Sequence, residues 1–140
     1  NEKPAGSNLI HQQSSKMAKM IIDTYLEPNV SEVWGSEVRL YYPGLYAGTT
    51  DLVGLWKGKP AIMDFKQSNK PKKLSWIGDY ELQTIAYMSA HNHLFGTNIR
   101  CGVIMICCVD LTPQLFTVEG DRFDELEDVW WKRVEKFHLS

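Results

Sequence analysis

The chain has 140 residues, of which 44% are hydrophobic and 23% are charged, and its formal net charge is −2. A chain of this size and composition can bury a hydrophobic core, so we expect one domain over residues 1–140. No apolar run approaches the roughly 18 to 20 residues that are needed to cross a bilayer, so we expect no membrane association. The slightly negative charge argues against a protein that is basic over its whole surface.

The first half of the chain predicts a helix followed by strands. Apolar residues at helical spacing predict a helix over about residues 7–26, which Pro28 would stop. The segment "EVRLYY" at 37–42 reads as a strand that ends at Pro43 and Gly44. Two further strands, "GTTDLVGLW" at 48–56 and "PAIMDFKQ" at 60–67, flank the segment "KGK" and predict a β-hairpin.

The second half predicts a helix, two strands and a final helix. Helical spacing returns between Tyr80 and Ser89, and Gly96 follows the end of this helix. The apolar run "RCGVIMICCV" at 100–109 fits a central strand that is covered on both faces, and "QLFTV" at 114–118 fits its hairpin partner. An amphipathic helix is expected over 121–137. The order predicts a mixed α/β domain with a central mixed β-sheet flanked by helices.

All three cysteines, Cys101, Cys107 and Cys108, fall in the predicted central strand. An odd and clustered set of cysteines indicates buried thiols in a reducing compartment, so we expect a cytoplasmic location. Cys107 and Cys108 are adjacent and would point to opposite faces of a strand, which argues against a shared tetrahedral metal site.

Three charged residues of the predicted hairpin are expected to share one face of the sheet. If Gly58 and Lys59 form a two-residue turn, Asp51 lies directly across from Lys66, and Asp64 points the same way as Lys66. A simple Asp–Lys bridge at an exposed sheet end would explain these charges. Two carboxylates and an ammonium also fit a divalent-cation site in which the lysine orients or activates water and offsets phosphate charge.

Six of the 15 basic residues but one of the 17 acidic residues lie between Lys57 and Lys73. Such a run is usually a solvated loop. Because it adjoins the charged hairpin, we expect Lys70, Lys72 and Lys73 to contact phosphates without reading sequence. Trp76, just after this loop, is well placed to stack on a base of a single strand.

These motifs, "GTTDLVG", "AIMDFKQS" and a helix with "YELQTIAY", resemble those of the RecB-type branch of the PD-(D/E)xK nuclease superfamily. Within that branch, the chain most resembles the phage and mitochondrial genome-maintenance exonucleases, which degrade DNA from its ends. The resemblance implies a restriction-endonuclease-like core and one or two Mg²⁺ or Mn²⁺ ions. It also implies that Asp51, Asp64 and the backbone carbonyl of Phe65 bind metal, and that Lys66 acts on the attacking water.

The resemblance implies further site residues. Gln83 and Tyr87 match the Q-x-x-x-Y motif of the family, and with Tyr80 they would form one helix stripe that faces the site. The family often has a metal-binding histidine on the first helix, and His11 stands in that place, although it follows Gly6 by five residues rather than the commoner four. Glu37 is a further acidic metal-ligand candidate. Related nucleases with an iron-sulfur cluster need a cysteine ahead of the nuclease motifs, and none precedes Cys101, so we expect no cluster.

The function predicted from the sequence is metal-dependent hydrolysis of phosphodiester bonds at the ends of DNA, with single-stranded DNA as the expected substrate. Three alternatives share the same core or sheet: a structure-specific endonuclease, a junction resolvase, and a noncatalytic nucleic-acid-binding module. A resolvase would typically act as a dimer, whereas we expect this chain to be a monomer.

Overall fold

The computed structural model describes residues 5–139, with side chains described from residue 12 onward. Four helices, five strands and two short helical turns follow one another in the predicted order of helix, strands, helix, strands, helix. In chain order they are α1 (Ala5–Ile21), the π-helical turn η1 (Ile22–Leu26), α2 (Glu27–Asn29), β1 (Val30–Tyr42), β2 (Tyr46–Trp56), β3 (Lys59–Ser68), the 3₁₀ turn η2 (Leu74–Trp76), α3 (Gly78–Phe95), β4 (Cys101–Cys108), β5 (Pro113–Val118) and α4 (Asp121–Leu139).

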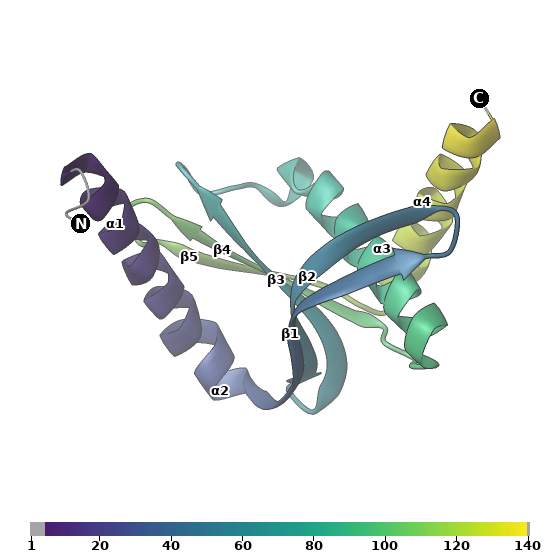
Figure 1. The fold of residues 1–140 in the computed structure, drawn as a ribbon, viewed down its shortest axis with the longest axis horizontal. Helices are drawn as coiled ribbons and strands as arrows, with labels where there is room; N and C mark the ends of the chain where they lie inside the picture. Colours follow the sequence, from purple (N-terminus) through teal and green to yellow (C-terminus); the bar gives the residue numbers. More distant parts are fainter. Residues whose placement is uncertain (1–4, 140) are drawn as a thin grey trace.

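The five strands form one mixed sheet in the order β1-β2-β3-β4-β5. β3 and β4 are parallel, and the other neighbouring pairs are antiparallel. Because parallel neighbours need a crossover connection, the chain leaves β3, forms α3 on one face and returns to β4. This arrangement confirms the predicted mixed sheet flanked by helices (Figure 1).

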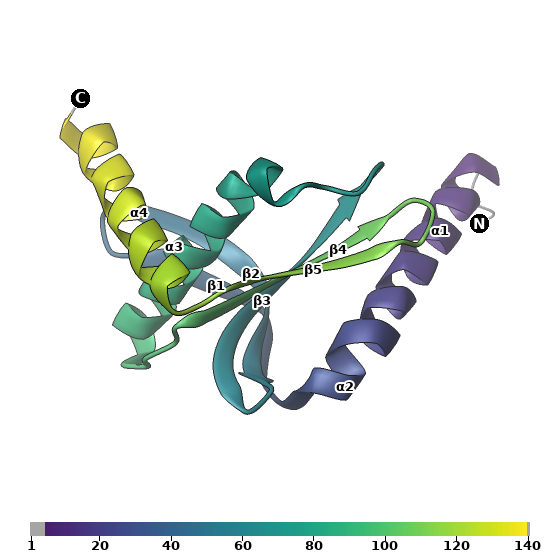
Figure 2. The same ribbon diagram turned by 180° about the vertical axis from the view of Figure 1, so that it is seen from behind.

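Each face of the sheet has its own hydrophobic core. On one face, Met17 and Ile21 of α1 pack against a cluster of sheet residues that includes Met63 and Met105. On the other face, α3 and α4 pack through Ile85 and other apolar residues against the neighbouring positions of the same strands. The two views of the ribbon show α1 on one side of the sheet and α3 with α4 on the other (Figures 1 and 2).

β4 is the central strand that the apolar run predicted. All eight of its residues are buried, because helices cover both of its faces. Its three cysteines are free and buried, as expected from their clustering. None of the helices in the described part of the chain is long and apolar enough to cross a membrane.

The first helical region differs from the prediction at its end. Helical backbone continues through η1 and α2 to Asn29, so Pro28 does not stop it. Pro28 occupies the first turn of α2, where a missing backbone N–H costs little. β1 then begins at Val30 rather than at residue 37. It is therefore a long strand of 13 residues at the edge of the sheet.

The hairpin turn between β2 and β3 also differs from the prediction. Lys57 and Gly58 form the turn, with φ values of 48° and 80°, and Trp56 pairs with Lys59. Two consecutive residues with positive φ are the signature of a type I′ turn, in which glycine suits the second position. The register therefore places Asp51 across from Asp64, and the predicted pairing of Asp51 with Lys66 is wrong. Moving the two-residue turn by one position shifts the register by two residues, so Asp51, Asp64 and Lys66 still point to the same face of the sheet.

Candidate active site

The site lies where β2 and β3 separate. The two strands pair from Trp56 and Lys59 as far as Leu52 and Met63, whereas β3 continues beside β4 up to Ser68. Figure 1 shows the β1–β2 hairpin curving away from the end of β3 toward α3 and α4. Backbone N–H groups at such a fork lose their ladder partners and need other acceptors.

Two carboxylates supply those acceptors. The N–H of Asp51 donates to Oδ1 of Asp64 at 3.0 Å, and the N–H of Phe65 donates to Oδ2 of Asp51 at 2.7 Å. Each acid therefore receives a hydrogen bond from the backbone of the opposite strand. The fork brings Asp51 and Asp64 together although the predicted register was wrong.

Asp64 is the buried member of the pair, with 3% of its surface exposed. Its Oδ1 also accepts a hydrogen bond from the hydroxyl of Thr50 at 3.0 Å, whereas its Oδ2 has no hydrogen-bond partner among the described side chains and backbone. Burial raises the pKa of Asp64, the nearby Asp51 charge adds to this, and the hydrogen bond from the Asp51 N–H and the charge of Lys66 oppose it. An ionised oxygen without a partner in a buried site costs free energy unless a cation compensates it.

The two acids fit a hard divalent cation. Mg²⁺ is commonly held by one or two carboxylates while it keeps several waters, and Asp51 and Asp64 provide that number. Among the residues with described side chains, no group of three or more His, Cys, Asp or Glu gathers in a way that could hold a metal ion. The donor set of this part of the chain is therefore two carboxylates, one of which has a buried free oxygen.

Lys66 connects the strand to α3. Its ammonium donates to Oε1 of Gln83 at 2.6 Å and lies 5.1 Å from the centre of the Tyr80 ring. The amide oxygen and the face of the ring both favour a positive charge, so they hold the ammonium at a defined place beside the acids.

Tyr87 completes the helix stripe on α3. Its ring lies against Gly48 of β2, where a Cβ would come within 2.6 Å of Cε1. Burial raises the pKa of Tyr87, and the charge of Asp64 adds to this. Gly48 is therefore required for the close approach of the ring. Tyr80 and Gln83 contact Lys66 of β3, and Tyr87 contacts Gly48 of β2, so the three residues of the predicted stripe lie against the strands that carry the acids.

Two further metal ligands, Glu37 and His11, were predicted from the sequence. Glu37 is exposed and has a positive φ of 50°, and the register of its neighbours places it opposite Asp51. The backbone at His11 is part of α1, but its side chain lies outside the described ones. The roles of Glu37, His11 and the Phe65 carbonyl stay predictions.

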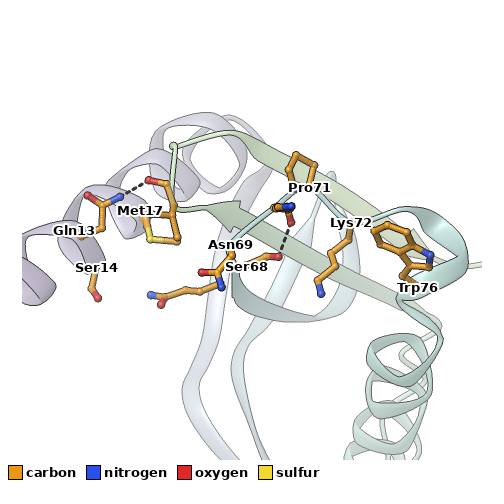
Figure 3. Close-up of a pocket in the computed structure, with 11 residues that line it drawn as sticks. Gln13, Ser14, Met17, Ser68, Asn69, Pro71, Lys72 and Trp76 are labelled. Carbon is orange, nitrogen blue, oxygen red and sulfur yellow. Dashed lines mark hydrogen bonds between the residues drawn. The ribbon is translucent and has the colours of Figure 1, made fainter.

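A cleft of about 730 Å³ opens beyond the end of β3, between α1 and the loop that leads to α3. Figure 3 shows Trp76 and Lys72 near one end of it and Gln13 and Ser14 of α1 near the other. The side chain of Gln13 donates a hydrogen bond to the carbonyl of Val109 and so ties α1 to the turn after β4. The lining residues are Gln13, Ser14, Met17, Gln67, Ser68, Asn69, Lys70, Pro71, Lys72, Trp76 and Val109.

The four residues predicted to contact nucleic acid lie at this cleft or beside it. Lys70, Lys72 and Trp76 line it, and the Lys73 ammonium lies 5.1 Å from the centre of the Trp76 ring. Trp76 keeps 60% of its surface exposed. Gln114 fixes the loop, because its side chain exchanges two hydrogen bonds with the backbone of Lys72, at 2.7 and 2.8 Å.

A smaller, apolar pocket of about 220 Å³ also lies along α1. Met17 lines the cleft, and the next residue, Ala18, lines this pocket together with Asp51. α1 therefore runs beside both the basic cleft and one of the two acids.

Sequence reasoning missed Thr50, Gln13, Ser14 and Gln114. Thr50 directly precedes Asp51, and this adjacency to a predicted metal ligand was the available signal. Gln13 and Ser14 follow His11 closely on the same helix. No local signal marks Gln114, because its contact with Lys72 joins segments that are 42 residues apart.

No family model matches the chain. The chain is 37% identical over 96 residues to the human mitochondrial genome maintenance exonuclease 1, a match that covers 66% of this chain and 28% of the human protein. The mouse protein of the same name is 38% identical over 71 residues, which are 49% of this chain and 21% of that protein. The chain therefore spans about a quarter of the length of these relatives.

The fold is also found in a crystal structure of a protein from Eubacterium rectale that is described as a candidate exonuclease. The TM-score is 0.56 at 15% identity, and the match covers 89% of this chain and 50% of that one. At this identity the likeness concerns the fold alone. The fold, the sequence relatives and the ordered motifs together support the resemblance to a PD-(D/E)xK-like nuclease.

Proposed function

We propose that this chain is the nuclease domain of a metal-dependent DNA exonuclease that hydrolyses phosphodiester bonds at the ends of single-stranded DNA. The observation that carries the proposal is the buried and unpartnered Oδ2 of Asp64, which lies beside Asp51 on a strand that also carries Lys66. A purely structural carboxylate would be expected to use both of its oxygens.

Asp51 and Asp64 would hold Mg²⁺ or Mn²⁺. Such an ion, when bound, supplies positive charge that stabilises the phosphate during hydrolysis and lowers the pKa of water. The ammonium of Lys66, held by Gln83 and Tyr80, adds a fixed positive charge that can orient a water and stabilise the developing negative charge. No covalent intermediate on the protein is required.

The cleft would bind the DNA strand near the site. Gln67 and Ser68, which line it, directly follow Lys66 on β3. Lys70, Lys72 and Lys73 supply positive charge for phosphates, and the exposed ring of Trp76 offers a stacking surface for a base of any type. We therefore expect little sequence preference.

The proposal is tested by incubating the protein with end-labelled single-stranded and double-stranded DNA, with Mn²⁺ or with EDTA. We expect the wild type to release short products from the single-stranded substrate with Mn²⁺ and not with EDTA. We expect Asp64→Asn to release none under either condition. The absence of cleavage of either DNA in Mn²⁺ or Mg²⁺ would contradict the proposal and leave a noncatalytic binding module.

A covalently closed single-stranded circle, offered beside a linear strand of the same sequence, separates exonuclease from endonuclease. An exonuclease leaves the circle intact, whereas a structure-specific endonuclease or a junction resolvase cuts substrates that have no ends. Size-exclusion chromatography gives the oligomeric state, for which we propose a monomer.

A further inference from the structure

Thr50 has a buried hydroxyl that is directed at the Asp64 carboxylate. None of its surface is exposed, and its Oγ1 donates to Oδ1 of Asp64 at 3.0 Å, while the backbone carbonyl of Met63 is farther away at 3.5 Å. A buried hydroxyl needs a partner, and the better contact of Thr50 is with the carboxylate.

The two oxygens of Asp64 are therefore unequal. Oδ1 receives two hydrogen bonds at 3.0 Å, one from Thr50 and one from the N–H of Asp51, whereas Oδ2 is buried and receives none from the part of the chain that the structure describes. A carboxylate oxygen offers about two lone-pair sites. Both sites on Oδ1 are thus occupied by the protein, and Oδ2 alone has lone pairs available for a ligand.

We infer that Thr50 is a positioning residue that fixes the Asp64 carboxylate and limits it to one-oxygen coordination through Oδ2. The inference rests on the proposed function, because it assumes that Asp64 binds a cation. It assigns Thr50 a role in metal selection. Mg²⁺ requires compact octahedral coordination, whereas Ca²⁺ accepts more oxygens and often takes both oxygens of a carboxylate. Because the hydrogen bonds occupy Oδ1, coordination of Ca²⁺ by both oxygens of Asp64 is disfavoured.

Calorimetric titration of the purified protein with Mn²⁺, Mg²⁺ and Ca²⁺, in the absence of DNA, tests the inference. Thr50→Val keeps the shape of the side chain and removes the donor. We expect its Mn²⁺ affinity to fall by about tenfold or more, as is typical when a partner of a metal ligand is removed. Its Ca²⁺ affinity should fall less, because one lone pair of Oδ1 becomes available. Thr50→Ser retains the hydroxyl and should restore the wild-type affinities.

The matched control is Thr49→Val, the same change at the neighbouring exposed residue, which should alter neither affinity. If Thr50→Val does not fold, Thr50→Cys replaces it, since a thiol is a weak donor of similar size. An unchanged Mn²⁺ affinity in the variant, or an equal loss for Mn²⁺ and Ca²⁺, would overturn the role of Thr50 while the wild type still binds Mn²⁺ and cleaves DNA. A wild type that neither binds Mn²⁺ nor cleaves would instead overturn the proposed function, and the role of Thr50 with it.

Discussion

The ammonium of Lys66 on β3 and the amide oxygen of Gln83 on α3 are 2.6 Å apart. This hydrogen bond joins the strand that carries Asp64 to the helix that covers it. It also decides where the positive charge of the site lies, because a lysine side chain has many rotamers and needs a partner to stay in one of them.

Removal of the ammonium should strongly slow cleavage without loss of the fold. We expect Lys66→Ala to lower the turnover number on single-stranded DNA by roughly 100- to 1000-fold, the usual effect of losing one group that stabilises developing charge. Its Mn²⁺ affinity should stay close to that of the wild type, because Asp51 and Asp64 remain. Lys59→Ala, at the other end of the same strand and paired with Glu119, is the control and should cleave normally. Near-normal turnover of Lys66→Ala would contradict the assignment.

Gln83→Leu should keep the charge of Lys66 but remove the acceptor that holds its ammonium in one place. A hydrogen bond to a charged group contributes about 1.5 to 3 kcal/mol, so a tenfold to hundredfold lower turnover number is expected. Gln83→Glu keeps an acceptor at the same position and should retain more activity. Single-turnover kinetics at saturating DNA measure the effect, and equal rates for both variants would show that the contact has no role in turnover.

Gly48→Ala should destabilise the protein, because the new Cβ would lie 2.6 Å from Cε1 and 3.1 Å from the hydroxyl oxygen of Tyr87. Overpacking of this kind typically costs about 1 to 3 kcal/mol of the free energy of unfolding. Gly78→Ala is the matched control, since its Cβ would meet nothing within 4 Å. Urea denaturation gives both values. If the clash is the cause, Gly48→Ala should cost less in a Tyr87→Ala background.

Lys70→Ala and Lys72→Ala should weaken DNA binding equally for all sequences and flatten its dependence on salt. Each phosphate contact that is lost lowers the slope of log affinity against log salt by about 0.7 for a single strand. Fluorescence anisotropy with catalytically inactive protein at several salt concentrations measures the slope. Lys132→Ala on α4, whose ammonium pairs with Asp128, should not change it. A wild-type slope in both cleft variants would exclude the cleft as the phosphate-binding surface.

The contribution of Asp64 to the stability of the metal-free protein should decrease as the pH rises. Burial raises the pKa of Asp64, so the folded state holds its proton more tightly than the unfolded state. The contribution of this group is therefore most favourable below the ordinary aspartate pKa of about 3.9, and it is lost as the pH rises through the raised value. In EDTA at neutral pH, Asp64→Asn should melt at a higher temperature than the wild type, and the difference should shrink near pH 4.

Asp79→Asn, which changes an acid whose side chain is 93% exposed, is the control for the removal of one negative charge. Thermal melts of the three proteins between pH 4 and pH 8 provide the comparison. A difference between Asp64→Asn and the wild type that does not vary with pH would contradict the role of burial. Addition of Mn²⁺ at neutral pH should stabilise the wild type and not Asp64→Asn.

The sequence alone determined the order of the elements, the central buried strand and the closeness of Asp51 to Asp64. The spacing of apolar residues predicts the order of the elements, and an uninterrupted apolar run predicts the buried strand, because both patterns reflect which faces are covered. The third follows from the predicted β-hairpin, in which residues at similar distances from the turn must meet. The helix stripe of Tyr80, Gln83 and Tyr87 was also predictable, since helical geometry is local.

Only the tertiary structure decided the exact register and the inequality of the Asp64 oxygens. The segment "KGK" permits a turn at Lys57–Gly58 or at Gly58–Lys59, and the choice depends on backbone angles that the letters do not encode. The free Oδ2 arises because β2 and β3 separate at Asp51, a feature of sheet curvature. The cleft likewise requires α1 to lie beside a loop more than 50 residues away, which depends on long-range packing rather than on any local pattern.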